Sequence, residues 1–324
     1  MNSLGMFNFD VEDQNIAERM AYIDFKLMFT GSINRSDLNR MFGLAEASAS
    51  KMMAKYSSYR KANMIYNPKL RFNEIVRSDF SPLVNLSAET ALGMLANGFN
   101  RNKLYDRPEV AYTRIGNVAN HLDPESVAKI TRAMSLGYAI ECKYYSSTSD
   151  DHDARVLFPL SLLFDGRNWI FRAFHKKENN TGVFRNFNFS RACDIEECLD
   201  IKRTTQEELS SDREWNTHVP LMLVPHGRLS KLQKETLFAD YGLTEDKRII
   251  TERAALLWYL FTLWAIDTRP ESEYQAELEQ YNQELQEIRS GERTTFSREY
   301  KYYNFRLTNK DMVEAVRESL KLAL

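Results

Sequence analysis

Arginine and aromatic side chains are concentrated in residues 168–191, which read NWIFRAFHKKENNTGVFRNFNFSR. Alternation along a predicted strand places ring-bearing and small side chains on one face: Trp169, Phe171, Ala173 and His175. Ile170, Arg172 and Phe174 fall on the other face. After a polar loop at 176–182, a second predicted strand carries hydrophobic and guanidinium groups on a single face: Val183, Arg185, Phe187, Phe189 and Arg191.

Two explanations fit this mixture of rings and guanidinium groups. Guanidinium groups bind phosphate or carboxylate through paired hydrogen bonds and stack on rings, so the surface suits an anionic ligand. An aromatic sheet core with arginines reaching solvent at its edges fits equally well. If the surface is a pocket, its candidate ligand-binding residues are Tyr144, Ser146, Arg155, Trp169, Phe171, Arg172, His175, Arg185, Phe187 and Arg191.

The elements that would position these side chains begin near residue 139, where hydrophobicity starts to alternate with a period of two. The pair Asp165-Gly166 predicts a hairpin turn that leads directly into residues 168–191. About five short strands within roughly 65 residues predict a small, strongly bent sheet or barrel.

The segment 31–77 is basic, with nine Lys or Arg against three Asp or Glu, whereas the whole chain has a formal charge of -2. A helix is predicted up to Gly31, a second, short helix between Asn34 and Gly43, and a third over 46–59. This is the order of a helix-turn-helix. Two short strands at 64–66 and 70–75, turned at residues 67–69, predict a wing.

A basic winged helix-turn-helix suggests binding to double-stranded DNA, with the third helix in the major groove and the flanking residues on phosphates. The candidate DNA-binding residues are Arg35, Ser48, Ser50, Lys51, Lys55, Arg60, Lys61, Asn63, Lys69 and Arg71. A small helical bundle with a solvated basic face is the alternative. Residues 79–136 predict a helical connector.

The sequence contains no recognisable catalytic motif. The five histidines lack metal spacing, and neither a phosphate-binding GxxxxGK[ST] loop nor a GxSxG motif occurs, so no cofactor is expected. The run SDDHD at 149–153 is interpreted as a polar loop and not as a metal site. Three cysteines without CxxC spacing fit a reduced, cytoplasmic compartment. The N-terminus shows no secretory signal.

The C-terminal third predicts a strand at 219–224, a helix at 229–238 and a buried helix over 249–266. The apolar run within that helix, 254–266, is shorter than the roughly 20 residues that span a bilayer, and Trp258 and Trp264 are expected in the core. His226 lies in a loop, where a structural role is favoured over ligand binding. An acidic helix at 271–289 has heptad spacing that permits a partner helix, although packing within its own domain is favoured.

Four runs in the middle of the chain resemble the WYL domain of bacterial transcriptional regulators: YYSST at 144–148, LFP at 157–159, DGRNWIFRAFH at 165–175 and FRNFNFSR at 184–191. The family's tripeptide would be Trp169-Ile170-Phe171. A literal WYL at 258–260 is interpreted as coincidence. Residues 42–56 are similar to the recognition-helix region of the CapW and BrxR branch, which controls phage-defence loci. Residues 214–243 resemble the C-terminal accessory domain of that branch.

The resemblance implies a multidomain α+β protein. Its expected parts are a winged helix-turn-helix domain (1–78), a helical linker or dimerisation region (79–136), an Sm-like WYL ligand-sensing domain (137–205) and an α+β accessory domain with the acidic helix inserted (206–324).

The function implied is that of a homodimeric repressor of a phage-defence operon. It would bind a pseudo-palindromic double-stranded DNA operator and be released by a nucleotide or nucleic-acid ligand, without any membrane association. A nucleic-acid-sensing partner that modulates a defence enzyme without binding an operator is the alternative, and a hydrolase is the least favoured class.

Overall fold

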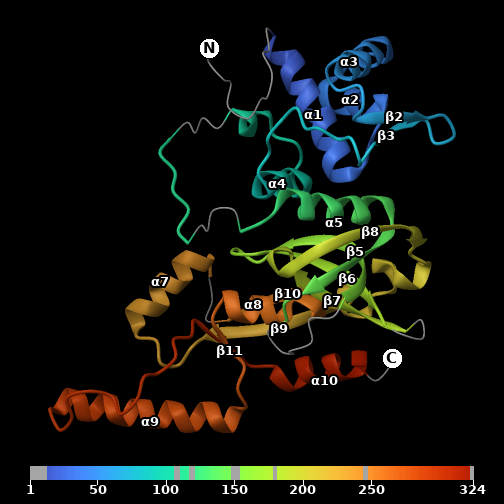
Figure 1. Ribbon diagram of the computed structural model, residues 1–324. Helices are drawn as coiled ribbons and strands as arrows, with labels where there is room; N and C mark the ends of the chain where they lie inside the picture. Colours follow the sequence, from blue (N-terminus) through green and yellow to red (C-terminus); the bar gives the residue numbers. More distant parts are fainter. Residues whose placement is uncertain are drawn as a thin grey trace. The chain divides into compact units, whose positions relative to one another are not determined.

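The computed structural model describes residues 13–105, 110–116, 121–146, 154–177, 181–243 and 247–321 (Figure 1). The polar run at 149–153 lies outside these residues. The chain divides into two compact units, and each is described by itself. The N-terminal unit contains residues 1–164 and 168–208, and the C-terminal unit contains residues 165–167 and 209–324.

Three helices open the N-terminal unit: α1 (Gln14–Thr30), α2 (Arg35–Phe42) and α3 (Glu46–Tyr59). Asn34 and Asp37 form a reciprocal capping box at the start of α2. Gly31 ends α1 in the left-handed conformation with φ 78°, and Gly43 ends α2 in the same way. A Cβ atom on Gly31 would lie 2.7 Å from the end of the Leu136 side chain, which would have to move, and the positive φ itself favours glycine there. The predicted helix ends are confirmed.

The wing consists of β2 (Met64–Asn67) and β3 (Phe72–Ile75), which pair antiparallel, and β1 (Ser32–Ile33) joins β3 to complete a three-stranded sheet. The turn is longer than predicted. The side chain of Asn67 accepts hydrogen bonds from the backbone N–H groups of Lys69 and Leu70, and Arg71 has a φ of 56°. Residues 70 and 71 therefore belong to the turn and not to the strand.

The connector contains α4 (Ala88–Asn97), the 3-10 turn η1 (Arg101–Leu104) and α5 (Pro124–Leu136). Ser87 caps α4 and Asp123 caps α5, where Pro124 occupies the first turn. Helix α5 packs against α1 on one side and against strands β4, β5 and β8 on the other (Figure 1). It is therefore the physical link between the helix-turn-helix and the large sheet.

The large sheet has the strand order β7-β6-β5-β4-β8, and all its pairs are antiparallel. Its strands are β4 (Tyr138–Tyr144), β5 (Ala154–Phe164), β6 (Trp169–Lys176), β7 (Gly182–Asn188) and β8 (Ala192–Lys202). Edge strands β7 and β8 do not pair with each other within the described residues. The sheet is therefore open, and the predicted Sm-like barrel closure is not observed.

The two faces of this sheet have different environments. One face, which includes Ile140, Leu157, Phe171 and Phe187, belongs to a hydrophobic core continuous with α1, α3, α4 and α5. The opposite face packs a smaller cluster around Phe158 and Phe174. The chain leaves β7 through a 3-10 turn, η3 (Phe189–Arg191), so the prediction that Phe189 and Arg191 continue the strand face is wrong.

The C-terminal unit has a four-stranded sheet in the order β10-β9-β12-β11. Its strands are β9 (His218–Pro225), β10 (Arg248–Arg253), β11 (Ile266–Asp267) and β12 (Phe305–Leu307). Its helices are α6 (Arg213–Asn216), α7 (Lys231–Tyr241), α8 (Leu257–Leu263), α9 (Glu271–Ser290) and α10 (Lys310–Lys321). Short 3-10 turns, η5 (Leu209–Ser211) and η6 (Ala254–Leu256), precede α6 and α8, and a further one, η4 (Thr205–Glu207), lies at the end of the N-terminal unit.

The predicted buried helix over 249–266 is wrong. Residues 248–253 form an edge strand paired with β9, and the helix that follows is only seven residues long. Trp258 is 68% exposed and not in the core, whereas Trp264 packs against the hydrophobic core of this unit. An apolar run without a clear period specifies neither helix nor strand, and here it is shared among three elements.

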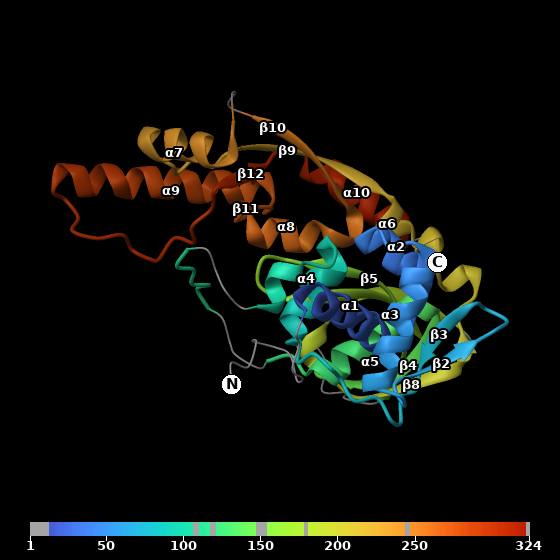
Figure 2. The ribbon, with the colours of Figure 1, turned by 90° about the horizontal axis from the view of Figure 1, so that it is seen from above.

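Helix α9 packs within its own domain, as favoured from the sequence. The Tyr281 ring stacks on Phe296 with centroids 5.1 Å apart, and the Glu284 carboxylate accepts from the backbone N–H of Ser297 at 2.8 Å. Figure 2 shows the segment after α9 returning along the length of the helix.

Candidate nucleic-acid interface

Helix α3 presents a polar face to solvent. Ala49, Met52, Met53 and Tyr56 are buried on its inner side. Of the predicted DNA-binding residues, Ser48, Lys51 and Lys55 are exposed on its outer side. Ser50 is half-buried, and its hydroxyl donates to the Glu46 carbonyl at 3.0 Å.

Basic side chains continue from α3 to the wing. Lys61, Lys69 and Arg71 are exposed, and the last two lie at the turn between β2 and β3. Arg60 is half-buried and donates through Nε to the Ser81 carbonyl at 3.0 Å, so part of its function is structural. Arg35 is exposed and paired with Glu46 at 2.9 Å.

Asn63 must be removed from the predicted DNA-binding set. It is 1% exposed, and its amide donates to the Tyr56 hydroxyl at 2.8 Å and to the Ser81 carbonyl at 2.9 Å. Its carbonyl oxygen accepts from the backbone N–H of Ser81 at 2.9 Å. These bonds tie the end of α3 to residue 81, and no part of the side chain is left for phosphate.

Asn63 is one end of a buried network centred on Asp24 of α1. The Tyr56 hydroxyl donates to one carboxylate oxygen of Asp24 at 2.6 Å. The backbone N–H groups of Leu83 and Val84 donate to the other oxygen at 3.0 and 3.2 Å. Burial raises the pKa of Asp24 to about 6 despite these bonds, because all of its bonding partners are neutral. The network fixes α3 on α1 and positions the chain beyond the wing.

A second buried network joins the helix-turn-helix to the large sheet. Arg132 of α5 donates to the Met28 carbonyl at the end of α1 at 2.8 Å, and to both carboxylate oxygens of Glu197 on β8 at 2.9 and 2.7 Å. Tyr138 and Arg77 also donate to Glu197. Burial opposes ionisation of Glu197, but its interactions with Arg132, Tyr138 and Arg77 together outweigh burial and lower its pKa. The ion pair therefore connects α1, α5 and the sheet.

The strand register separates the predicted ligand-binding residues of the large sheet. Arg172 pairs with Asn186, whereas Ala173 pairs with Arg185, so the two arginines lie on opposite faces. Arg172 is only 2% exposed and donates to the Asn186 side chain at 3.3 Å. Trp169, Phe171 and Phe187 are buried in the core. These four residues are structural in this conformation, because none presents a surface to a ligand.

The register also brings some of these residues together. Cys142 pairs with Arg155, Leu157 with His175 and Ala173 with Arg185, which puts Tyr144, Arg155, His175 and Arg185 on one face. The Arg155 guanidinium lies 5.2 Å from the centre of the Tyr144 ring. Ser146 is half-buried just after β4, and Arg191 is half-buried in η3. Tyr144 is 7% exposed and belongs to the core, so the surface that remains from the predicted set consists of Arg155, His175 and Arg185.

Neither a metal-binding cluster nor a membrane-spanning helix occurs in the described ranges. In that part of the chain, no three His, Cys, Asp or Glu side chains come close enough together to hold a metal ion. None of the helices there is both long and apolar enough to cross a bilayer. His226, whose structural role was favoured, is buried against Asp267 with 3.2 Å between Nε2 and the carboxylate.

Three family models match the chain in sequence order. Residues 15–97 match the winged helix-turn-helix domain of the BrxR transcriptional regulator, residues 125–196 the WYL domain, and residues 218–285 the C-terminal dimerization domain of the BrxR transcriptional regulator.

The chain is also similar in sequence to two transcriptional repressors and in structure to one further protein. The DNA-binding transcriptional repressor CapW of Pseudomonas aeruginosa is 27% identical over 253 residues, covering 75% of this chain and 80% of that protein. CapW of Stenotrophomonas maltophilia is 29% identical over 250 residues, covering 74% and 80%. The proteasome accessory factor PafBC of Arthrobacter aurescens matches in structure with 16% identity, 89% and 52% coverage and a TM-score of 0.25, which is too low to support an argument. The three consecutive domain matches and these relatives show that the chain belongs to the BrxR and CapW branch of the WYL-domain transcriptional regulators.

Proposed function

We propose that this chain is a DNA-binding transcriptional repressor that acts as a homodimer, and that it is not an enzyme. The relatives described above are named DNA-binding transcriptional repressors, and the domain model matched at 218–285 is a dimerization domain. The observation that carries the proposal is the exposed cationic face of α3 and the wing, held in place by the buried network around Asp24.

The DNA-facing residues are then Ser48, Lys51 and Lys55 on α3, with Lys61, Lys69 and Arg71 beside and on the wing. Helix α3 would lie in the major groove, and the lysines and Arg71 would contact phosphates on either side. Arg35 and Ser50 would orient the start of α3 through their bonds with Glu46. Two such units in a dimer suit a pseudo-palindromic operator, which we place upstream of a phage-defence operon.

The DNA-binding proposal is tested with fluorescence anisotropy on the DNA upstream of the chain's own operon. We expect the double variant Lys51→Ala/Lys55→Ala to bind at least tenfold more weakly, and the slope of log affinity against log salt to fall by about 2, because two phosphate contacts are lost. Lys231→Ala is the matched control, since Lys231 is an exposed helical lysine of the C-terminal unit. Unchanged binding by the double variant would place the DNA interface elsewhere. If the wild-type protein showed no preference for operator DNA, the alternative function, a partner that modulates a defence enzyme, would be favoured.

The ligand-sensing surface that we propose consists of Arg155, His175 and Arg185, and excludes the buried Arg172 and Tyr144. A ligand there would shift the sheet, and the Arg132–Glu197 pair would carry the shift to the end of α1. A coupling of about 1–3 kcal/mol would change operator affinity roughly 5- to 150-fold.

Sensing is tested by adding nucleoside monophosphates and short single-stranded oligonucleotides to the operator complex. We expect at least one of these probes to release the wild-type protein and to leave Arg155→Ala/Arg185→Ala bound. Lys143→Ala is the control, because Lys143 is exposed on the opposite face of β4. Equal release of the double variant, or no release of the wild type by any probe, would refute this surface as the sensor.

A further inference from the structure

A pocket of about 320 Å³ lies in the C-terminal unit, between the loop after β9 and the segment that follows α9. Its lining includes Arg228, Tyr281, Phe296, Arg298 and Tyr300. We propose that this pocket binds a small anionic ligand that carries a flat ring, of the size of a single nucleotide. The proposal concerns a site separate from the large sheet and does not depend on the proposed function.

The walls of the pocket are built by the return segment after Gly291. The Phe296 ring stacks on Tyr281 with an interplanar angle of 9°, and Tyr300 meets Tyr281 edge-on at 5.1 Å. Glu284 holds the segment through the backbone and hydroxyl of Ser297. The match to the dimerization domain ends at residue 285, so Phe296, Arg298 and Tyr300 lie beyond the part of the chain that this family model describes.

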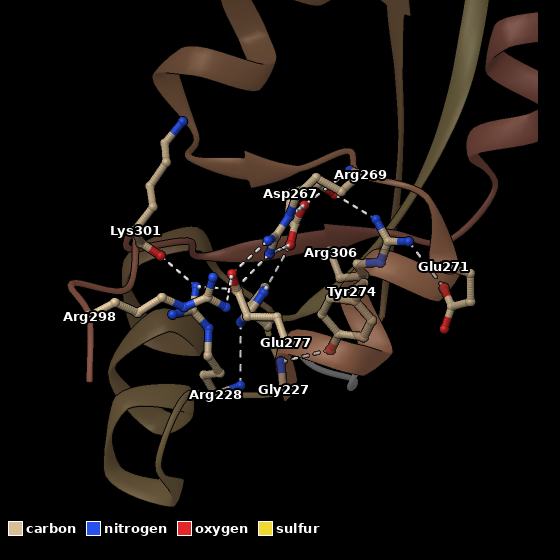
Figure 3. A network of polar contacts seen from close by, with 11 residues as sticks. Gly227, Arg228, Asp267, Arg269, Glu271, Tyr274, Glu277, Arg298, Lys301 and Arg306 are labelled. Atoms are coloured by element: carbon tan, nitrogen blue, oxygen red, sulfur yellow. Dashed lines mark hydrogen bonds and ion pairs between the residues drawn. The ribbon is translucent and has the colours of Figure 1, made fainter. Parts of the chain in front are cut away.

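Arg228 lies at the centre of an aromatic cage. Its guanidinium carbon lies 5.6 Å from the ring centre of Tyr281, 5.3 Å from that of Tyr300 and 5.9 Å from that of Tyr303. The Arg228 side chain is 8% exposed, and its terminal nitrogen donates to the Lys301 carbonyl (Figure 3). An arginine in such a cage is preorganised, which lowers the entropy lost when it binds a ligand.

Two polar atoms in the pocket wall lack hydrogen-bond partners. Nε of Arg228 and the hydroxyl of Tyr300 are both buried and unpartnered. Both are hydrogen-bond donors, and buried donors in native proteins are nearly always satisfied. Both residues line the pocket, so we assign their free donors to an acceptor atom of the ligand. An anionic oxygen is such an acceptor.

The charge around the pocket also favours an anion. Arg228, Arg298 and Lys301 line it against one acidic residue, Glu299. Behind them, the Glu277 carboxylate is shared by three guanidinium groups, at 2.8 Å from Arg269, 3.2 Å from Arg298 and 3.6 Å from Arg228 (Figure 3). Arg269 is also paired with Asp267 at 2.6 Å, so two carboxylates face three guanidinium groups and one positive charge remains.

The aromatic rings that line the pocket indicate that the ligand also carries a flat ring. Tyr302 also lines the pocket and is 60% exposed, which leaves an aromatic surface open to solvent. Bases and other flat rings stack on tyrosine and on guanidinium planes. The volume lies near the lower end of the range for small-molecule sites, about 300–1,000 Å³, so a ring with one anionic group fits better than a polymer.

The test is isothermal titration calorimetry on the full chain. The probes that carry both a ring and an anion are AMP, UMP and 4-hydroxyphenylacetate, which distinguish nucleotides from aromatic acids. Adenosine supplies a ring alone and inorganic phosphate an anion alone. We expect at least one combined probe to bind at least tenfold more tightly than adenosine or phosphate. If no combined probe binds, or if phosphate alone binds as tightly, the proposal is overturned.

Variants locate the site. Arg298→Gln and Tyr300→Phe should each weaken binding at least fivefold, since one removes a cation and the other only the unpartnered hydroxyl. Arg298 is half-exposed, so its replacement leaves the fold intact, and equal thermal unfolding of each variant and the wild type verifies this. Arg317→Gln, at an exposed arginine of α10, is the matched control and should bind as the wild type does, whereas Arg185→Ala tests the large sheet. Loss of binding in Arg185→Ala with retention in both pocket variants would assign the ligand to the sheet and refute the pocket.

Discussion

Two fully buried aspartates, Asp24 in the N-terminal unit and Asp267 in the C-terminal unit, differ in the charge of their partners. Asp24 accepts from a tyrosine hydroxyl and two backbone N–H groups, all neutral. Asp267 accepts from the Arg269 guanidinium at 3.0 and 2.6 Å and lies 3.2 Å from His226. Burial raises the pKa of both, but the bonds with His226 and Arg269 reverse its effect and hold the pKa of Asp267 far below its usual range.

The difference teaches that the neutral donors around Asp24 do not offset the effect of burial on its pKa, whereas the guanidinium and imidazole beside Asp267 do. It also separates two kinds of support for a functional surface. Asp24 fixes α3 and the chain beyond the wing through a network that can lose its charge near neutral pH. Asp267 fixes Arg269, and through it Glu277 and the arginines of the C-terminal pocket, with a charge that persists.

Removing the Asp267 charge should have the largest effect on stability. Asp267→Asn leaves Arg269 without its closest counter-ion and places an amide N–H₂ group against a guanidinium. Loss of one partner of a buried ion pair costs about 3–5 kcal/mol, and we expect the free energy of unfolding of the C-terminal unit to fall by this amount. Urea unfolding followed by tryptophan fluorescence measures the loss.

The measurement is made in a Trp169→Phe background, because the other three tryptophans, Trp215, Trp258 and Trp264, all lie in the C-terminal unit. Asp240→Asn is the control, since Asp240 is exposed on α7 of the same unit. A loss for Asp267→Asn below about 1 kcal/mol would mean that the pair with Arg269 does not stabilise the fold, and the contrast with Asp24 would fail.

The sequence predicted local features of the N-terminal unit well. The Asn34–Asp37 capping box and the glycines at 31 and 43 determine helix ends through bonds within a few residues. Asp24 was not identified, because its partner Tyr56 is 32 residues away in sequence and becomes a neighbour only when α1 packs on α3. A polar residue on the inner side of a helix was the available signal, since Asp24 interrupts the apolar positions around Ile23 and Leu27.

Arginine and aromatic residues close in sequence were a poor guide to a site. Alternation along β6 and β7 separates Arg172 from Arg185, and the rings of Phe171 and Phe187 are needed for the core. The C-terminal pocket, in contrast, joins Arg228 to rings 53 to 75 residues further along, Tyr281 to Tyr303. Such convergence depends on how α9 and its return segment pack, which no local pattern encodes.

Asp24→Asn should have a smaller effect than Asp267→Asn. The new amide can still accept from Tyr56, but its N–H₂ group then faces the N–H groups of Leu83 and Val84, and two buried donors lose their acceptor. At pH 7 we expect a loss of about 2–4 kcal/mol in the free energy of unfolding of the N-terminal unit. Far-ultraviolet circular dichroism measures this unfolding. Asp79→Asn, at an exposed aspartate near the wing, should change it little. Equal stabilities of the two variants would exclude a structural role for the network.

The smallest expected effect is the pH dependence of the stability difference between wild type and Asp24→Asn. Since the pKa of Asp24 is raised from 3.8 to about 6, the folded state binds a proton more tightly than the unfolded chain does. Its contribution to stability is therefore full below pH 4 and is lost as pH rises through 6. The difference in unfolding free energy between wild type and Asp24→Asn should fall by about 1–3 kcal/mol over this window, because other groups titrate alike in both proteins.

Asp267 should show the opposite sign, because its folded pKa is depressed. The advantage of wild type over Asp267→Asn should be constant above its unfolded value, near pH 4, and shrink as pH falls further. Unfolding curves at pH 3, 4, 5, 6 and 7 for both pairs of proteins compare the two aspartates directly. If the advantage of wild type over Asp24→Asn instead grows as pH rises from 4 to 6, the neutral donors of Tyr56, Leu83 and Val84 stabilise the carboxylate as effectively as Arg269 does. The two networks would then be equivalent.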